Sequence, residues 1–162
     1  MKDAKKILRI LEQDCRTSVQ DIATMTGMAE EDVAAAIAQM EKDNIINGYT
    51  AMVDWDKTDE DAVTALIEVK ATPQGGDGYD RIAARIYQYD EVESVYLMSG
   101  AYEYCVIING RTLKEVAHFV IEKLAPIEGV VSTSTHFILT KYKEKRKLFG
   151  VHYKQEERPL FI

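Results

Sequence analysis

The sequence is poor in the residues that build disulfide-rich, metal-binding or membrane-spanning proteins. Only two of its 162 residues are cysteines and three are histidines. Cys15 and Cys105 are too few and too far apart for a disulfide framework, which indicates a reduced, cytoplasmic protein. The histidines show no metal-ligand spacing, so we expect neither a metal site nor a cofactor. No apolar run approaches the roughly 20 residues of a membrane-spanning helix, and we expect no membrane partner.

Positive charge is also in deficit, with 20 lysines and arginines against 27 aspartates and glutamates. Residues 1–61 carry seven basic and fourteen acidic side chains, and residues 62–140 carry six and ten. Only residues 141–162 are basic, with seven basic side chains against three acidic ones. Nucleic-acid-binding proteins are usually basic, so the overall composition argues against a generic member of that class.

Residues 1–50 have the apolar spacing of short amphipathic helices. Ser18 suits the N-cap of the second helix and Gly27 suits its C-cap. Beyond the third helix, Ile45–Thr50 has the pattern of a strand with a turn. A short glycine-containing turn between two helices, followed by a strand pair, predicts a winged helix-turn-helix domain. The alternative is a helical fragment that leans on a partner. The predicted helices cover residues 3–14, 18–26 and 30–43.

Residues 62–140 alternate between strand and helix patterns. Their order is strand, helix, strand, strand, helix, strand, which predicts a ferredoxin-like βαββαβ domain in an α+β protein. We expect Gly100 and Ala101 to form a tight turn between the middle strands, since glycine tolerates positive φ. One face of such a sheet stays uncovered, and a second copy of the chain is the usual cover. The predicted strands are 62–70, 92–99, 102–108 and 130–139, and the predicted helices are 78–89 and 113–124.

Two charged segments flank this second domain. Residues 51–61 are strongly acidic and without apolar periodicity, which indicates a solvated linker. Residues 141–162 form a basic C-terminal tail. We expect residues 141–147 to extend the last strand, and either to lie near DNA or a neighbouring subunit or to protect the sheet edge with lysine.

Several segments carry a family resemblance through their order and spacing. In the first domain they are Asp14–Ser18 and Met40–Tyr49, and in the second Ser99–Tyr104 and Ile127–Thr135. Over residues 3–140 the chain resembles the Lrp/AsnC (feast/famine) transcriptional regulators. The resemblance implies a transcription regulator that binds double-stranded DNA through its helix-turn-helix and senses a small effector, commonly an amino acid, through its ferredoxin-like domain. It also implies a homodimer that assembles further, often to an octamer.

The predicted third helix is unusual for a DNA-reading helix because residues 28–41 hold four acids and no lysine or arginine. Members of the family that it resembles usually carry arginines there and a serine or threonine at the N-cap, where this chain has Ala29. We therefore expect DNA binding to be weak. A sensing and assembly module with weak or lost DNA binding is the alternative. The candidate DNA-binding residues are Arg16, Thr17, Ser18, Gln39, Lys42 and Asn47.

The glycine-containing hairpin turn of the second domain is the candidate effector site. Backbone N–H groups at such a turn can hold a carboxylate, and the Glu103 side chain can pair with an α-amino group. Hydroxyl groups of Thr133 and Ser134 can add hydrogen bonds. The sequence offers no constellation of catalytic residues, so we expect no enzymatic activity. The candidate effector-binding residues are Gly100, Ala101, Tyr102, Glu103, Thr133 and Ser134.

Overall fold

The computed structural model describes residues 2–60, 62–73, 75–76 and 78–150. The chain divides into two compact units, Met1–Val53 and Asp54–Ile162. Among the described residues, no helix has the length and apolar character needed to cross a membrane.

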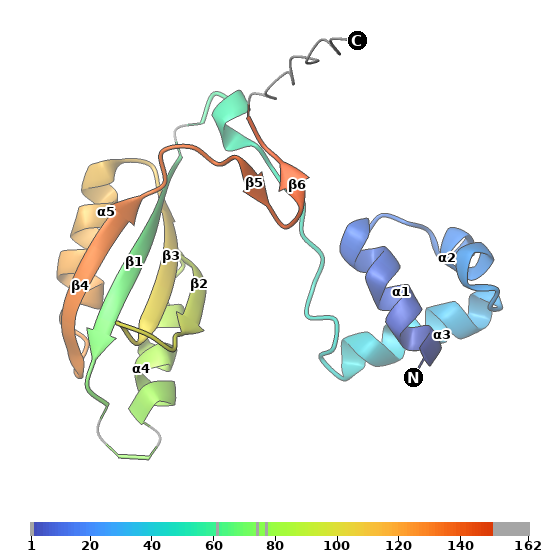
Figure 1. Ribbon diagram of the computed structural model, residues 1–162, viewed down its shortest axis with the longest axis horizontal. Helices are drawn as coiled ribbons and strands as arrows, with labels where there is room; N and C mark the ends of the chain where they lie inside the picture. The colour runs from blue at the N-terminus through green and yellow to red at the C-terminus, as the bar shows by residue number, and fades with distance from the viewer. Residues whose placement is uncertain (1, 61, 74, 77, 151–162) are drawn as a thin grey trace, which may run out of the picture. The chain divides into compact units, whose positions relative to one another are not determined.

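The first unit consists of the three predicted helices, whose ends are set by local hydrogen bonds. The Ser18 hydroxyl oxygen accepts from the Asp21 N–H at 3.1 Å, which caps the second helix. Gly27 ends that helix in the left-handed region at φ 73°, and its N–H donates to the Ala23 carbonyl at 2.8 Å. Ile7 and Ile22 are fully buried where the helices meet. The helices are α1 (Lys2–Gln13), α2 (Val19–Thr26) and α3 (Glu30–Lys42) (Figure 1).

The predicted wing is not formed. Residues 44–54, all of them described, contain neither helix nor strand. The N–H groups of Ile45 and Ile46 both donate to the Met40 carbonyl, at 2.9 and 3.1 Å, with Asn44 in the left-handed region at φ 53°. These amides cap the end of α3, so they cannot form a strand ladder. The expected linker, residues 51–61, contains a short 3-10 helix, η1 (Trp55–Lys57).

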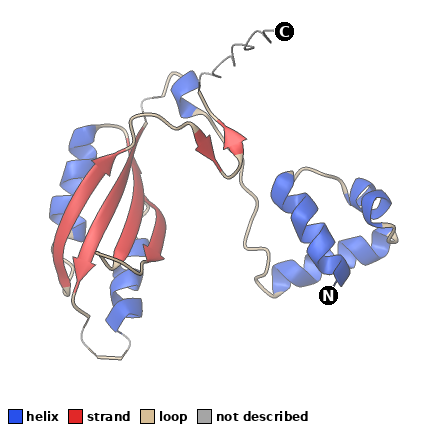
Figure 2. Cartoon of the chain, viewed as in Figure 1, coloured by secondary structure: helices blue, strands red, loops and turns tan. Residues whose placement is uncertain are grey.

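The second unit contains the predicted four-stranded antiparallel sheet, with strand order β2-β3-β1-β4. The two crossover helices lie on the same face of this sheet (Figure 2). The ferredoxin-like βαββαβ order is therefore confirmed. The elements are β1 (Val63–Ala71), α4 (Gly78–Tyr87), β2 (Val92–Leu97), β3 (Tyr104–Gly110), α5 (Leu113–Phe119), η2 (Val120–Leu124) and β4 (Val130–Phe137).

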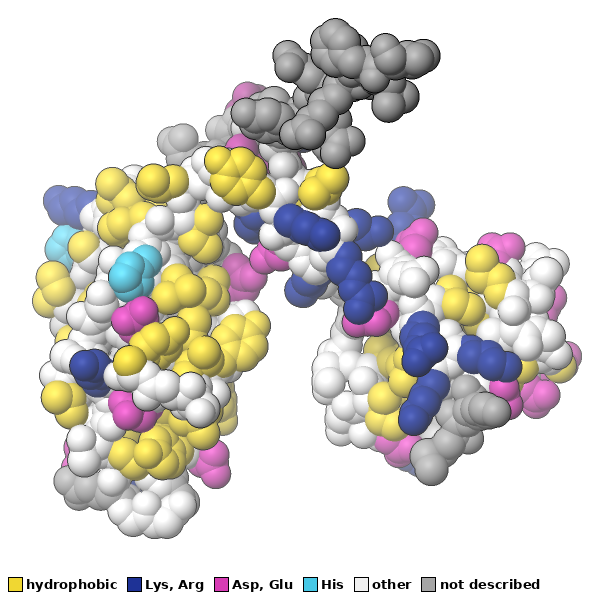
Figure 3. Space-filling model, in the orientation of Figure 1, with side chains coloured by type: hydrophobic (Ala, Val, Ile, Leu, Met, Phe, Trp, Pro, Cys, Tyr) yellow, Lys and Arg dark blue, Asp and Glu magenta, His cyan; other side chains and the backbone are white. Residues whose placement is uncertain are grey.

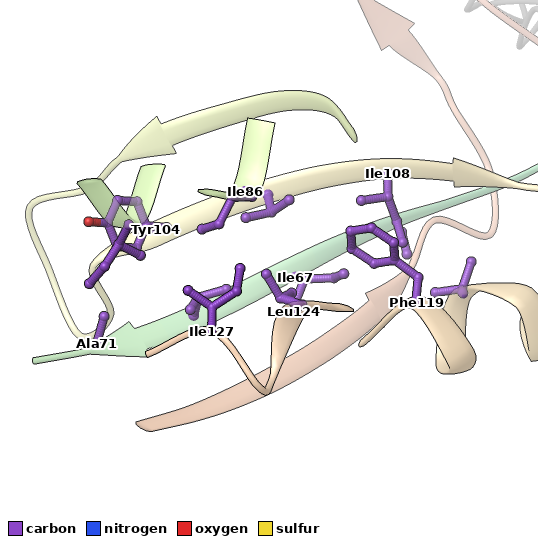
Figure 4. Close-up of a cluster of buried hydrophobic side chains, with 13 residues drawn as sticks. Ile67, Ala71, Ile86, Tyr104, Ile108, Phe119, Leu124 and Ile127 are labelled. Carbon is purple, nitrogen blue, oxygen red and sulfur yellow. The ribbon is translucent and has the colours of Figure 1, made fainter. Parts of the chain in front are cut away.

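Alternation along the strands separates a helix-covered face from an open face. Ile67 and Val69 of β1 are fully buried, and they pair with Val106 and Tyr104 of β3, respectively. These side chains pack with residues of α4, α5 and η2 into one apolar core (Figure 4). The Tyr104 hydroxyl in this core donates to the Tyr79 carbonyl at 2.8 Å, and burial raises the pKa of its phenol.

The connection between β2 and β3 is wider than the predicted tight turn. The strands end at Leu97 and resume at Tyr104, and the Met98 N–H closes the loop by donating to the Glu103 carbonyl at 2.7 Å. Gly100 does not have a positive φ. A six-residue loop needs no left-handed residue at this position, so the expected role of the glycine was wrong.

The predicted helix over 113–124 changes character halfway along. It is α-helical up to Phe119 and then becomes a π-helix, η2. Leu113 and Ile121, whose spacing with Val116 and Leu124 is that of one apolar helix face, are 57% and 68% exposed, while Phe119 is buried. A π-turn holds more residues than an α-turn, and this shifts the face that meets the sheet.

An ion pair joins η2 to the residue before β2. The Lys123 ammonium donates to the Glu91 carboxylate and lies 5.2 Å from the centroid of the Tyr89 ring. This hydrogen bond lowers the pKa of the Glu91 carboxyl group.

The basic tail does not extend β4. It forms a separate hairpin of β5 (Lys143–Glu144) and β6 (Lys147–Leu148). Lys145 and Arg146 make its turn at positive φ values of 40° and 69°, which directs the chain back on itself instead of along the sheet. The remainder of the predicted tail, residues 151–162, lies outside the described residues.

We predict that Gly129→Ala destabilises the second unit by about 1–3 kcal/mol. Gly129 has φ 95°, and an added Cβ would lie 2.8 Å from Ile82 Cδ1 in the core. Gly76→Ala is the matched control, because an added Cβ there meets nothing within 4 Å. Urea unfolding followed by circular dichroism measures both variants, and equal midpoints would contradict the prediction.

Candidate functional site

The N-terminal end of α2 is held in place by Asp14. Its carboxylate accepts from the Arg16 N–H at 2.9 Å, and its carbonyl accepts from the Thr17 hydroxyl at 2.9 Å. The Ser18 hydroxyl donates to the Asp21 carboxylate at 2.6 Å. Three of the predicted DNA-binding residues thus lie together in one ordered turn, which leaves Arg16 exposed.

The turn before α2 combines groups that attract an anion with a carboxylate that repels one. A helix N-terminus favours anions because its first N–H groups have no partners within the helix. Here the Asp21 carboxylate places a negative charge at this helix end. The Asp21 N–H and carboxylate are both hydrogen-bonded to the Ser18 hydroxyl. A phosphate at this end of α2 therefore depends on the guanidinium of Arg16.

The side chains in the middle of the outward face of α3 are small and uncharged. Ala34, Ala35 and Ala38 are exposed, while Val33 and Met40 face the core. An alanine face can contact thymine methyl groups but offers no hydrogen bond to a base. The Ala29 N-cap makes no side-chain hydrogen bond, as expected.

The other predicted DNA-binding residues lie at and beyond the C-terminal end of α3. Gln39 donates to the Asp43 carboxylate at 2.9 Å, whereas Lys42 and Asn47 are exposed. Nearby, the Tyr49 hydroxyl donates to Glu41 at 2.8 Å, which raises the pKa of the phenol. Among the described residues, no hydrogen bond links Gln39, Lys42 or Asn47 to the turn before α2, so the candidates form two groups that are held in place independently.

The predicted effector-binding residues gather at one end of the sheet. Gly100 and Ala101 are exposed in the β2–β3 loop, and Tyr102 is half-buried. Antiparallel register places this loop beside the end of β1, since Val69 pairs with both Tyr104 and Thr133. The structure thus brings the loop and the middle of β4 to the same end of the domain.

Glu103 has a structural role at this end that the sequence did not reveal. Its Oε2 accepts from the Ala71 N–H at 2.7 Å, and its own N–H donates to the Val69 carbonyl at 3.0 Å. The register of β1 against β4 shifts between Lys70 and Ala71, which frees the Ala71 N–H from the strand ladder. One carboxylate oxygen of Glu103 is therefore committed to this irregularity.

Thr133 and Ser134 lie on opposite faces of the sheet. Thr133 is paired with the buried Val69 and faces the helices, whereas Ser134 is paired with Glu68 on the open face. The Ser134 hydroxyl is 3.3 Å from Nε2 of His136. A ligand on one face of the chain can reach only one of these two hydroxyl groups.

Sequence reasoning missed two charged features around this domain. A small cleft between β1, α4 and β4 contains Arg85 and Glu128, whose closest side-chain atoms are 3.8 Å apart. A groove of about 620 Å³ lies along α5 and contains His118, bonded to Glu122 at 3.2 Å. The i, i+4 spacing of this histidine and glutamate was visible in the sequence. No three potential metal ligands cluster anywhere in the described part of the chain.

Comparison with known proteins gives the same two-part division of the chain. Residues 5–41 match the AsnC-type helix-turn-helix domain, and residues 64–148 match the Lrp/AsnC ligand binding domain. The chain is 48% identical over 145 residues to the uncharacterized HTH-type transcriptional regulator YugG of Bacillus subtilis, covering 89% of this chain and 87% of that protein.

Solved structures share the fold. Escherichia coli AsnC superimposes with a TM-score of 0.67 at 22% identity, covering 89% of this chain and 95% of that one. The transcriptional regulator NMB0573 of Neisseria meningitidis, solved as a complex with L-Met, has a TM-score of 0.70 at 22% identity, covering 89% and 92%.

Both domain matches and the identity to YugG extend over the elements described above. The fold and the domain order agree with the matches, and the matched proteins are regulators and not enzymes. The chain belongs to the Lrp/AsnC family of transcriptional regulators, with a helix-turn-helix DNA-binding domain and a ligand-binding domain.

Proposed function

We propose that this regulator binds an amino acid at the β2–β3 end of its sheet and couples that binding to weak, salt-sensitive contact with double-stranded DNA in the cytoplasm. The β2–β3 loop carries the first part of the proposal. Among the described residues, no acceptor engages the N–H groups of Gly100, Ala101 and Tyr102. Three neighbouring free N–H groups on an exposed loop suit the carboxylate of a small ligand.

Glu103 supplies the second half of an amino-acid site. Its Oε2 is bonded to Ala71, which holds the carboxylate in place and leaves Oε1 to accept from an α-ammonium group. A nearby anion site and a fixed carboxylate are what a zwitterion requires. The complex of the Neisseria protein with L-Met supports an amino acid as the ligand class.

DNA contact rests on the turn before α2 and the end of α3. Arg16 at the turn, with the Thr17 and Ser18 groups beside it, is suited to a phosphate, and Lys42 and Asn47 are exposed beyond α3. Because α3 offers alanines and acids, most of the affinity must come from phosphates, and phosphate contacts weaken as salt rises. The cation-poor α3 also favours the second candidate function, a sensing module that has lost DNA binding.

The open face of the sheet is suited to a second copy of the chain. Tyr96 is 54% exposed on this face, and Leu66 and Ile107 are half-buried on the same face. Figure 3 shows hydrophobic side chains interspersed with a few charged ones over the sheet. Apolar surface of this kind favours association. We infer a homodimer through this face, which can assemble further to an octamer.

We predict that Arg16→Ala weakens DNA binding and lowers the salt dependence of the binding constant by about one phosphate contact for each subunit on DNA. Binding to a duplex from the protein's own promoter, measured over a salt series, tests this. Arg111→Ala, an exposed arginine of the second unit, is the control. A wild-type protein that retains no duplex at low salt would support the alternative function and contradict DNA binding.

We predict that Glu103→Gln lowers the affinity for the bound amino acid about 10-fold to 100-fold, since the amide nitrogen that replaces Oε1 cannot accept a hydrogen bond from an ammonium group. Glutamine keeps an oxygen for the Ala71 N–H, so the melting temperature should not change. Calorimetric titration with the twenty amino acids measures the affinity, with Glu115→Gln as the control. Unchanged affinity in Glu103→Gln would remove Glu103 from the site.

We predict that Tyr96→Glu reduces the molar mass in solution, because it places a charge on the proposed dimer face. Ile121→Glu is the control, since Ile121 is 68% exposed on the helical layer. Light scattering coupled to size exclusion measures both variants. A wild-type protein of monomer mass, or an unchanged mass for Tyr96→Glu, would rule out this dimer face.

A further inference from the structure

The hairpin of β5 and β6 concentrates positive charge that the rest of the described chain lacks. Residues 141–147 hold five basic side chains and one acidic side chain. Residues 1–140 hold 13 basic and 24 acidic side chains. Lysine and arginine side chains gather over the hairpin in Figure 3. A polyanion is therefore attracted to this element and repelled by most of the remaining surface.

Most of this charge is not neutralised within the hairpin. Lys141 is partly buried, 2.8 Å from the Glu144 carboxylate and 5.2 Å from the centre of the Phe149 ring. Lys141 therefore takes the one acidic partner. Lys143, Lys145 and Lys147 are exposed, and no acidic group among the described residues forms an ion pair with them.

The backbone of the hairpin presents two of the cations at its tip. Lys145 and Arg146 occupy the turn with φ values of 40° and 69°. Two-residue hairpin turns with both φ values positive favour Asn-Gly, because other residues are strained in the left-handed region. Lys145 and Arg146 therefore lower the stability of the turn while they add positive charge to it. This combination indicates a binding role.

The base of the hairpin is closed by a hydrogen bond and a buried ring within the same segment. The Phe149 N–H donates to the Tyr142 carbonyl at 2.9 Å, which continues the ladder formed by the Lys143–Leu148 and Glu144–Lys147 pairs. Phe149 is buried. The cations are thus presented by an ordered ribbon. A two-stranded ribbon has the width that the major groove of DNA admits.

We propose that the β5–β6 hairpin is a second DNA-contacting element, which binds the phosphate backbone through Lys143, Lys145 and Lys147 and supplies the cations that α3 lacks. This inference rests on the proposed DNA binding. It assigns to the ligand-binding domain a direct share of DNA affinity that does not depend on base sequence. A ligand that changes how subunits assemble would then also change how many hairpins reach the duplex.

The test compares two variants that each lose two lysines, K145Q/K147Q on the hairpin and K57Q/K114Q elsewhere on the second unit. Fluorescence anisotropy measures binding of the full chain to a random-sequence duplex of about 30 base pairs between about 50 and 300 mM salt. We expect K145Q/K147Q to reduce the slope of log affinity against log salt by about 2 per hairpin on the DNA, and to weaken low-salt binding at least 10-fold. The control variant should stay within about twofold of wild type, because its lysines make no phosphate contact.

A second variant separates charge from folding. K145N/R146G removes two cations while giving the turn the residues that its φ values favour, so the hairpin stays folded and its melting temperature does not fall. We expect it to reduce the slope of log affinity against log salt by about 1 per hairpin on the DNA, because Lys145 is the one proposed phosphate contact that it removes. Equal slopes for wild type, K145Q/K147Q and K145N/R146G would overturn the role of the hairpin.

The outcomes also distinguish this inference from the proposed function. If Arg16→Ala weakens binding and both hairpin variants bind like wild type, the helix-turn-helix binds DNA alone and only the hairpin proposal fails. If wild type binds no duplex at low salt, both proposals fail. If the hairpin variants instead change the molar mass and leave the slope intact, the cations serve contact between subunits, which also overturns the proposal.

Discussion

The second unit depends on the position of β1 between β3 and β4. Because β1 pairs antiparallel with both, alternate residues along it decide which side chains face the helices and which face solvent. Ile67 and Val69 form the centre of the core, while Leu66 and Glu68 lie on the open face. The same pairing places the β2–β3 loop beside the end of β1. Core, candidate ligand site and proposed dimer face therefore all follow from one register.

The irregularity at the end of β1 connects stability with the candidate site. The break in register between Lys70 and Ala71 frees the Ala71 N–H, which donates a hydrogen bond to the Glu103 carboxylate. This bond fixes the carboxylate next to the free N–H groups of the loop. A carboxylate held by the backbone loses little conformational entropy when it binds a ligand. The residue that completes the sheet is thus also the one that we propose to bind an ammonium group.

In this regulator the helix-turn-helix lies in one domain and most of the positive charge lies in the other. The helix-turn-helix has well-formed caps at Ser18 and Gly27, but its third helix presents alanines and acids outward. Cations are concentrated on the β5–β6 hairpin of the ligand-binding domain. Affinity for a phosphate backbone depends on the number of cations that reach it and not on which domain carries them. An acidic chain with net charge −7 is therefore compatible with DNA binding.

The sequence by itself determined the helix-turn-helix helices, the βαββαβ order and the cation-poor face of α3, because periodicity, capping residues and side-chain charge are local properties. It could not predict that Ile45 and Ile46 would cap α3 instead of forming a wing, or that η2 would turn Ile121 outward. Both outcomes are competitions for the same backbone groups, and tertiary packing decides them. The candidate site shows the same division, since loop residues 100–103 were visible in the sequence. The bond of Glu103 to Ala71, the opposite faces of Thr133 and Ser134, and the separate basic hairpin required the pairing of distant strands.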